Sequence, residues 1–147
     1  MWSLRRILFV IVLPLALGTW IYLAYRSLDL LVFQWLAFAH LIDPVLALRS
    51  HLEWSRPHET ILFSLPDGIW IYSSTCFMSM VWGRDQCVSA ACWISLPAVC
   101  GIGAEVLQIP FPMLGTFDIF DLLAGVMAVL LAQKTGKNQW KIIQQKI

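Results

Sequence analysis

The chain has 147 residues, of which 59% are hydrophobic and only 13% are charged. Soluble domains usually carry about 25% charged residues, so this composition excludes an ordinary soluble globule and predicts a single membrane domain. The formal net charge of +1 gives no electrostatic basis for binding nucleic acid, and we exclude nucleic acid as a partner.

The first apolar stretch covers residues 7–25 and follows Arg5 and Arg6. A run of about 19 residues can span a hydrocarbon core roughly 30 Å thick. No small-residue cleavage site follows the stretch, so we predict an uncleaved transmembrane helix rather than a signal peptide. Pro14 and Gly18 are expected to bend or thin this helix locally, which membrane helices tolerate.

Residues 28–48 form a second apolar stretch that polar and helix-breaking residues interrupt. These residues are Asp29, Gln34, His40, Asp43 and Pro44. The pattern fits a poor spanning helix, a re-entrant segment or an interfacial helix, and the sequence leaves the three open. Residues 49–59 follow as a polar loop.

Further spans are predicted at residues 60–82, 87–109 and 117–133. The Leu-Pro-Asp-Gly sequence at residues 65–68 is typical of a turn, so the regular part of the first of these helices is expected to begin near Asp67. Thr116 is expected to cap the last helix.

The basic residues indicate how the chain is oriented. The lysines all lie within residues 134–147, and Arg5 and Arg6 precede the first span. Lysine and arginine favour the cytoplasmic side, so both ends are predicted there, which requires an even number of spans. We therefore predict an all-α, polytopic transmembrane helical bundle with about four spanning helices plus one interfacial or re-entrant segment. Residues 1–133 would form the transmembrane domain, and residues 134–147 a basic cytoplasmic tail.

Several acidic residues lie within or at the ends of the predicted spans, where an Asp at a helix centre costs about 2.5 to 3.5 kcal/mol on insertion scales. They are Asp67, Glu105, Asp118 and Asp121. They fall near the start of one span, the end of the next and the start of the last. Because successive spans run antiparallel, we expect all of them at one membrane face, the extracytoplasmic one.

This gathering predicts a polar pocket at one rim of the bundle. Gln108 lies three residues after Glu105 and shares its helix face. Arg26, Arg49 and Arg56 are expected on the same side and are the candidate counter-charges.

Simpler interpretations of the same residues stay open. Asp67 and Asp118 also suit helix caps stabilised by the helix dipole. Glu105 and Gln108 also suit side chains that reach interfacial water. The cysteines, which form no CxxC pair, are expected to be ordinary buried thiols; they are Cys76, Cys87, Cys92 and Cys100. The sequence contains no metal-ligand spacing and no nucleotide-binding motif, so we predict no metal and no cofactor.

The later residues resemble a known family. Glu105 and Gln108, then Pro110, then Asp118 and Asp121 followed by a small-residue helix, resemble the C-terminal motif of VanZ-like membrane proteins. That motif is Glu-x-x-Gln, a short proline/glycine connection, and an aspartate pair three residues apart. The segment 65–70, which ends in Trp70, resembles a variant found in some relatives. The resemblance covers about residues 60–132 and departs from the common pattern at Thr116, Gly125, Ala128 and Ala132.

The resemblance implies a multi-pass protein of the bacterial plasma (inner) membrane and the cell envelope, since the family's founder is associated with teicoplanin resistance at the Gram-positive envelope. The candidate ligand-binding residues are Asp67, Trp70, Glu105, Gln108, Thr116, Asp118 and Asp121. Our first hypothesis is a non-enzymatic envelope protein that binds a polar group of a lipid or cell-wall precursor in the acidic pocket.

Two alternatives belong to other classes. One is a membrane enzyme in which paired carboxylates act as general acid and base or hold a divalent ion. The other is a small subunit or assembly factor with a membrane-protein partner.

Overall fold

A computed structural model describes residues 3–52, 58–83 and 87–144 of the chain. Every regular element in these ranges is a helix. The helical segments Leu4–Tyr25, Val88–Gln108 and Ile119–Gly136 are long and apolar enough to cross a membrane. The prediction of an all-α fold is therefore confirmed for the described residues, with three helices that are candidates to span a membrane.

The N-terminal helix has three parts, α1 (Leu4–Ile7), a π-helical turn η1 (Leu8–Val12) and α2 (Leu13–Tyr25). The π-helical turn lies just before Pro14, whose ring nitrogen cannot donate the usual helical hydrogen bond. Gly18 marks a close approach between helices, because a Cβ there would lie 3.0 Å from Cγ2 of Ile69. Small residues let membrane helices pack at this distance.

The ambiguous segment after α2 forms two short helices, α3 (Leu31–Phe38) and α4 (Ile42–Leu52). They contain 8 and 11 residues, or about 12 and 16 Å of helix, so neither can cross a hydrocarbon core of roughly 30 Å. His40 ends α3 with a positive φ of 56°. The amides of His40 and Leu41 donate to the carbonyls of Ala37 and Leu36, which is a Schellman turn with His in the usual glycine position.

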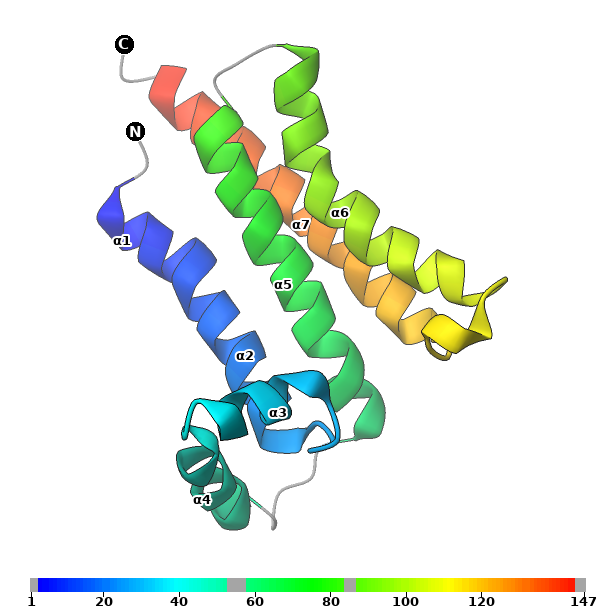
Figure 1. Ribbon diagram of the computed structural model, residues 1–147. Helices are drawn as coiled ribbons and strands as arrows, with labels where there is room; N and C mark the ends of the chain where they lie inside the picture. Colours follow the sequence, from blue (N-terminus) through cyan, green and yellow to red (C-terminus); the bar gives the residue numbers. More distant parts are fainter. Residues whose placement is uncertain (1–2, 53–57, 84–86, 145–147) are drawn as a thin grey trace.

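The next helix, α5 (Glu59–Trp82), runs through the middle of the bundle (Figure 1) and contacts α2, α6 and α7. Our expectation that its regular part begins near Asp67 is wrong, because Pro66 and Asp67 lie inside the helix. Packing overrides the local turn preference here. Pro66 is fully buried, and a Cβ on Gly68 would lie 3.1 Å from the carbonyl oxygen of Ala124.

The last helices are α6 (Val88–Gln108) and α7 (Ile119–Gln144), joined through the 3-10 turn η2 (Pro112–Leu114). The span predicted at residues 117–133 corresponds to the apolar segment Ile119–Gly136, and the helix itself continues to Gln144. The tail contains no proline and is rich in lysine and glutamine, which favour helix. On α7, Ala128 and Ala132 are buried, with 5% and 0% of their surface exposed.

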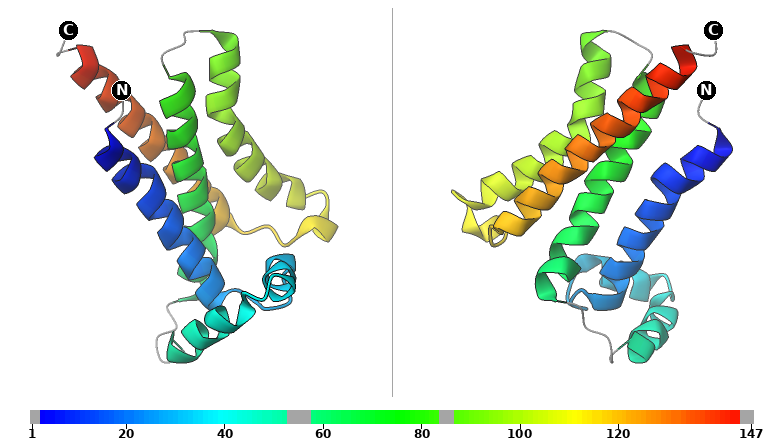
Figure 2. Two further views of the ribbon diagram at one scale, coloured as in Figure 1. Left: turned by 60° about the vertical axis from the view of Figure 1, so that its left-hand side comes forward. Right: turned by 180° about the vertical axis from the view of Figure 1, so that it is seen from behind.

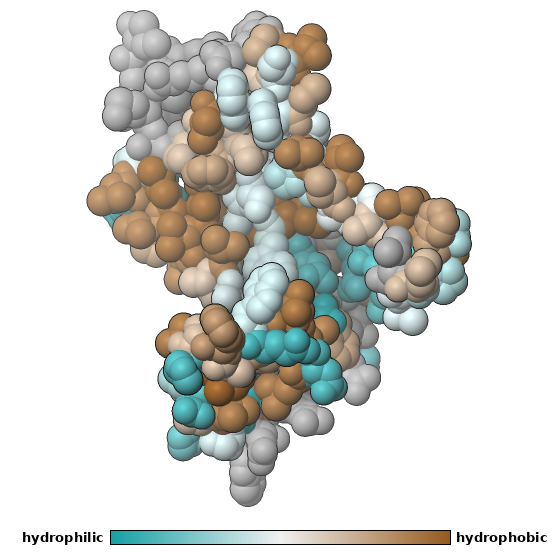
Figure 3. Space-filling view, in the orientation of Figure 1, coloured by the Kyte–Doolittle hydropathy of each residue, from teal (hydrophilic) through white to brown (hydrophobic). Residues whose placement is uncertain are grey.

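The long helices alternate in direction, so the two chain ends lie at one end of the bundle and α3 and α4 at the other (Figures 1 and 2). Large apolar side chains are exposed along the long helices, among them Phe9, Val99 and Leu130. Figure 3 shows hydrophobic side chains over the flank formed by α1 and α2, and a mixture of hydrophilic and hydrophobic ones around α3 and α4. An apolar outer surface of this kind indicates a lipid bilayer environment.

The cysteines only partly follow the expectation of buried thiols. Cys76 is buried, whereas Cys87, Cys92 and Cys100 are exposed on α6 or at its start. The outer surface of a membrane helix faces lipid, so apolar character does not predict burial within the protein.

Candidate acidic pocket between three helices

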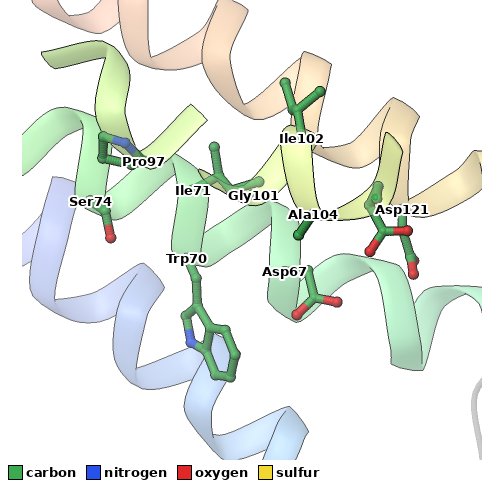
Figure 4. Close-up of a pocket in the computed structure, with 10 residues that line it drawn as sticks. Asp67, Trp70, Ile71, Ser74, Pro97, Gly101, Ile102, Ala104 and Asp121 are labelled. Carbon is green, nitrogen blue, oxygen red and sulfur yellow. The ribbon is translucent and has the colours of Figure 1, made fainter. Parts of the chain in front are cut away.

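A pocket of about 370 Å³ lies between α5, α6 and α7. It is lined by Asp67, Trp70, Ile71, Ser74, Pro97, Gly101, Ile102, Ala104, Glu105 and Asp121. The structure therefore brings together Asp67, Trp70, Glu105 and Asp121 from the residues that the sequence singled out. Figure 4 shows Asp67 and Asp121 at the same end of this pocket.

The positions of the three carboxylates along their helices explain this convergence. Glu105 lies one turn before the end of α6, and Asp121 lies in the first turn of α7. Asp67 lies in the first half of α5. Because α6 runs opposite to α5 and α7, these three positions fall at the same end of the bundle, as we expected from the threading of the chain.

Asp67 has a counter-charge within the chain. Nη2 of Arg26 lies 3.3 Å from Oδ2 of Asp67, with the two side chains 24% and 34% exposed. The same nitrogen donates to the carbonyl of Phe63 at 3.2 Å, and Nε of Arg26 is buried without a partner. The guanidinium carbon lies 4.8 Å from the ring centre of Phe63 and 5.7 Å from that of Tyr22, a geometry that favours a cation.

The second candidate counter-charge, Arg49, binds backbone instead of a carboxylate. Its Nη1 donates to the carbonyls of Leu23 at 3.0 Å and Arg26 at 2.8 Å. These acceptors lie at the C-terminal end of α2, where helical carbonyls lack partners and a positive charge is favourable. The guanidinium also lies over Phe33, at 5.6 Å from the ring centre. The third candidate, Arg56, lies outside the described residues.

Glu105 and Asp121 differ from Asp67 because the described part of the chain offers neither of them a cation. Nε2 of Gln108 donates to Oε1 of Glu105 at 3.2 Å. Three acceptor atoms in this group are buried without a hydrogen-bond partner, and they are Oε2 of Glu105, Oε1 of Gln108 and Oδ1 of Asp121. Buried acceptors are normally paired in native proteins, so these atoms lack a partner that they would be expected to have. Of their residues, Glu105 and Asp121 line the pocket.

Thr116 and Asp118 do not line the pocket. Our prediction that Thr116 caps the last helix is wrong, because Oδ1 of Asp118 accepts the hydrogen bond from the amide of Phe120 at 2.8 Å. The cap interpretation is thus correct for Asp118 and wrong for Asp67, which lies inside α5.

Gly115 shapes the connection before α7. Its φ of +147° is unfavourable for residues with a side chain, and a Cβ there would lie 3.2 Å from the carboxamide of Gln108. Glycine at this position therefore lets the connection pass close to Gln108, the partner of Glu105.

The apolar wall of the pocket was missed by reasoning from the sequence. Its residues are Ile71, Pro97, Gly101, Ile102 and Ala104. In an apolar helix, side chains that face lipid and side chains that face a pocket have the same character, so no local signal separates them. Ser74 also lines the pocket, whereas its neighbours Ser73 and Thr75 are buried elsewhere in the bundle. Among the described residues, no His, Cys, Asp and Glu group is arranged to hold a metal ion.

No family model, curated protein or solved structure matches the chain. The class that the fold defines is a multi-pass, all-helical membrane protein. The resemblance to VanZ-like proteins rests on the motif residues alone.

Proposed function

We propose that four helices cross the membrane, with α5 as the fourth. Its 24 residues correspond to about 36 Å of helix, which exceeds the roughly 30 Å of a hydrocarbon core. An even number of spans also agrees with the two chain ends lying at one end of the bundle (Figure 2). In this arrangement α3 and α4 lie at the interface, the basic end is cytoplasmic, and the pocket opens toward the extracytoplasmic face.

The function we infer is binding of a polar group from a membrane lipid or a cell-wall precursor in the acidic pocket. The observation that carries this proposal is the presence of unpaired carboxylate oxygens of Glu105 and Asp121 in a pocket of about 370 Å³. Each buried acceptor without a partner costs about 1 to 3 kcal/mol. A ligand that donates hydrogen bonds to these atoms would offset that cost.

Membership of the VanZ-like family, and with it a place in the bacterial cell envelope, forms part of the proposal. It is supported by the position of the motif residues, since Glu105 and Asp121 line one pocket and Gln108 bonds to Glu105.

The proposal is tested with the variants Asp121→Asn and Glu105→Gln. We expect mass spectrometry to find a small molecule that remains on the wild-type protein through detergent purification and falls by about tenfold in each variant, because a charge-assisted hydrogen bond is lost. Asp29→Asn is the matched control, since Asp29 is exposed and pairs with Ser27 outside the pocket. Circular dichroism and gel filtration check that the variants fold.

Two results would contradict the proposal. Equal retention by the wild type and both variants would remove the carboxylates from binding. Loss of folding in both variants would assign Glu105 and Asp121 a structural role.

A further inference from the structure

The pocket has two chemically different ends. Asp67 and Asp121 lie at one end, and Pro97 and Ser74 lie at the other (Figure 4). Along α5 the distance from Asp67 to Ser74 is about two helical turns, or roughly 10 Å. Between the ends the walls are apolar, with Ile71, Gly101 and Ile102 among the lining residues. A ligand that fills the whole pocket therefore needs a polar head and an apolar chain.

The charges at the polar end restrict the head further. Arg26 balances Asp67, whereas the described residues supply no cation to Glu105 or Asp121. An anionic ligand head would be repelled by these carboxylates, since like charges at short range in surroundings of low polarity cost several kcal/mol. The electrostatics therefore favour a cationic head.

The hydrogen-bonding atoms of the pocket also favour a cationic head group. Oε2 of Glu105 and Oδ1 of Asp121 are buried acceptors without a donor. The other oxygen of Glu105 already accepts from Gln108 at 3.2 Å, and the backbone of Asp118 also interacts with this carboxylate, so the carboxylate is held in place. An ammonium group that carries hydrogen supplies up to three donors and no acceptor, which matches an acceptor-only site.

We propose that the ligand of this pocket is an amphiphile whose head is an N–H-bearing ammonium group and whose apolar chain lies along α6 from Ile102 toward Pro97. This inference rests on the proposed binding function of the pocket and names its ligand class. The ammonium group donates to Glu105 and Asp121, and the chain displaces water from the wall of Ile71 and Ile102. An aminophospholipid and a single-chain amine share this chemistry.

The test uses the purified full-length protein in dodecyl maltoside and a matched set of probes titrated by native mass spectrometry. Dodecylammonium carries both features, dodecyltrimethylammonium has no N–H donor, dodecanol has no charge, and butylammonium has only a short chain. We expect one dodecylammonium per chain, and binding of the other three weaker by about tenfold or more, which corresponds to loss of one charge-assisted hydrogen bond or of several buried methylenes.

The variants use the same readout. Glu105→Gln and Asp121→Asn are expected to weaken dodecylammonium binding by about tenfold each, while Asp29→Asn keeps the wild-type affinity. Competition with phosphatidylethanolamine and with phosphatidylcholine of identical acyl chains distinguishes an aminophospholipid from a single-chain amine as the ligand. Displacement by phosphatidylethanolamine alone identifies an aminophospholipid, and no displacement by either identifies a single-chain amine.

Several results would overturn the inference and leave the proposed function intact. Equal binding of dodecanol or dodecyltrimethylammonium would exclude the N–H-bearing ammonium group. Equal binding of butylammonium would exclude a role for the chain. If dodecylammonium fails to bind while another molecule is retained in an Asp121-dependent way, the ligand class is wrong. Both proposals fail if no molecule is retained through these carboxylates.

Discussion

Two polar regions near the same end of the bundle differ in how the chain satisfies them. In the arginine region, Arg26 and Arg49 bond to backbone carbonyls or to Asp67, and each guanidinium lies over an aromatic ring. In the carboxylate region, Glu105 and Asp121 keep buried oxygens with no partner. In the first region the charges have partners within the protein, and only Nε of Arg26 stays without one. In the second region the carboxylates have no cation among the described residues.

This difference separates structural polar groups from ligand-binding ones. In surroundings of low polarity, a paired polar group fixes the positions of the elements that it joins. Arg26 and Arg49 join α2 to α5 and to α4 in this way. A buried polar group without a partner lowers stability, and its presence is explained where a ligand supplies the missing partner. Mutation should therefore affect stability in the first region and binding in the second.

The largest expected effect on stability follows the replacement of Arg26. Arg26→Met leaves Asp67 as an unpaired carboxylate in a half-buried position, and breaking such a pair costs about 2 to 4 kcal/mol. Unfolding of the purified protein by SDS in mixed micelles measures the loss. Adding Asp67→Asn to this variant should recover part of it, because the isolated charge is removed. A loss below about 0.5 kcal/mol for the single variant would contradict a structural role for the pair.

A smaller loss is expected for Arg49→Met. The variant leaves the carbonyls of Leu23 and Arg26 without their donor, at about 1.5 to 3 kcal/mol for charge-assisted hydrogen bonds. It isolates no opposite charge, so the loss should fall below that of Arg26→Met in the same assay. Arg5→Met, at an exposed position outside this region, is the control and should leave stability unchanged. Equal stability of the Arg49 and Arg5 variants would contradict a structural role for Arg49.

The smallest effect on stability is expected for Asp121→Asn in the ligand-free protein. The change removes one of two carboxylates that have no cation among the described residues, so the free energy of unfolding should change by less than about 0.5 kcal/mol or should rise. The same unfolding assay and the ligand-retention measurement are made on one preparation. A loss as large as that of Arg26→Met would show that Asp121 belongs to the structural class instead.

Much of the helical framework could be predicted from the sequence, because hydropathy and length suffice to identify membrane-spanning helices. The gathering of Asp67, Glu105 and Asp121 was also predictable, since antiparallel threading follows from short connections. The sequence could not show that Pro66 is accommodated inside α5, because burial against neighbouring helices decides this.

The details of the site depended on tertiary contacts. Three arginines were equal candidates for the counter-charge, and only the packing of α2 against α5 selects Arg26 for Asp67. The choice of Asp118 over Thr116 as the helix cap depended on where α7 begins. The apolar wall could not be predicted, because lipid and a pocket require similar side chains.

The placement of the pocket at a single membrane face is tested most directly by labelling cysteines with a membrane-impermeant thiol reagent. Asp29→Cys and Thr116→Cys, each in a background without the native cysteines, report on the exposed connections after α2 and before α7. Native Cys87, exposed at the start of α6, reports on the opposite end of the bundle. We predict that the reagent reaches positions 29 and 116 from the extracytoplasmic side and Cys87 from the cytoplasmic side. Labelling of positions 29 and 116 from opposite sides would contradict the shared face on which the acidic pocket depends.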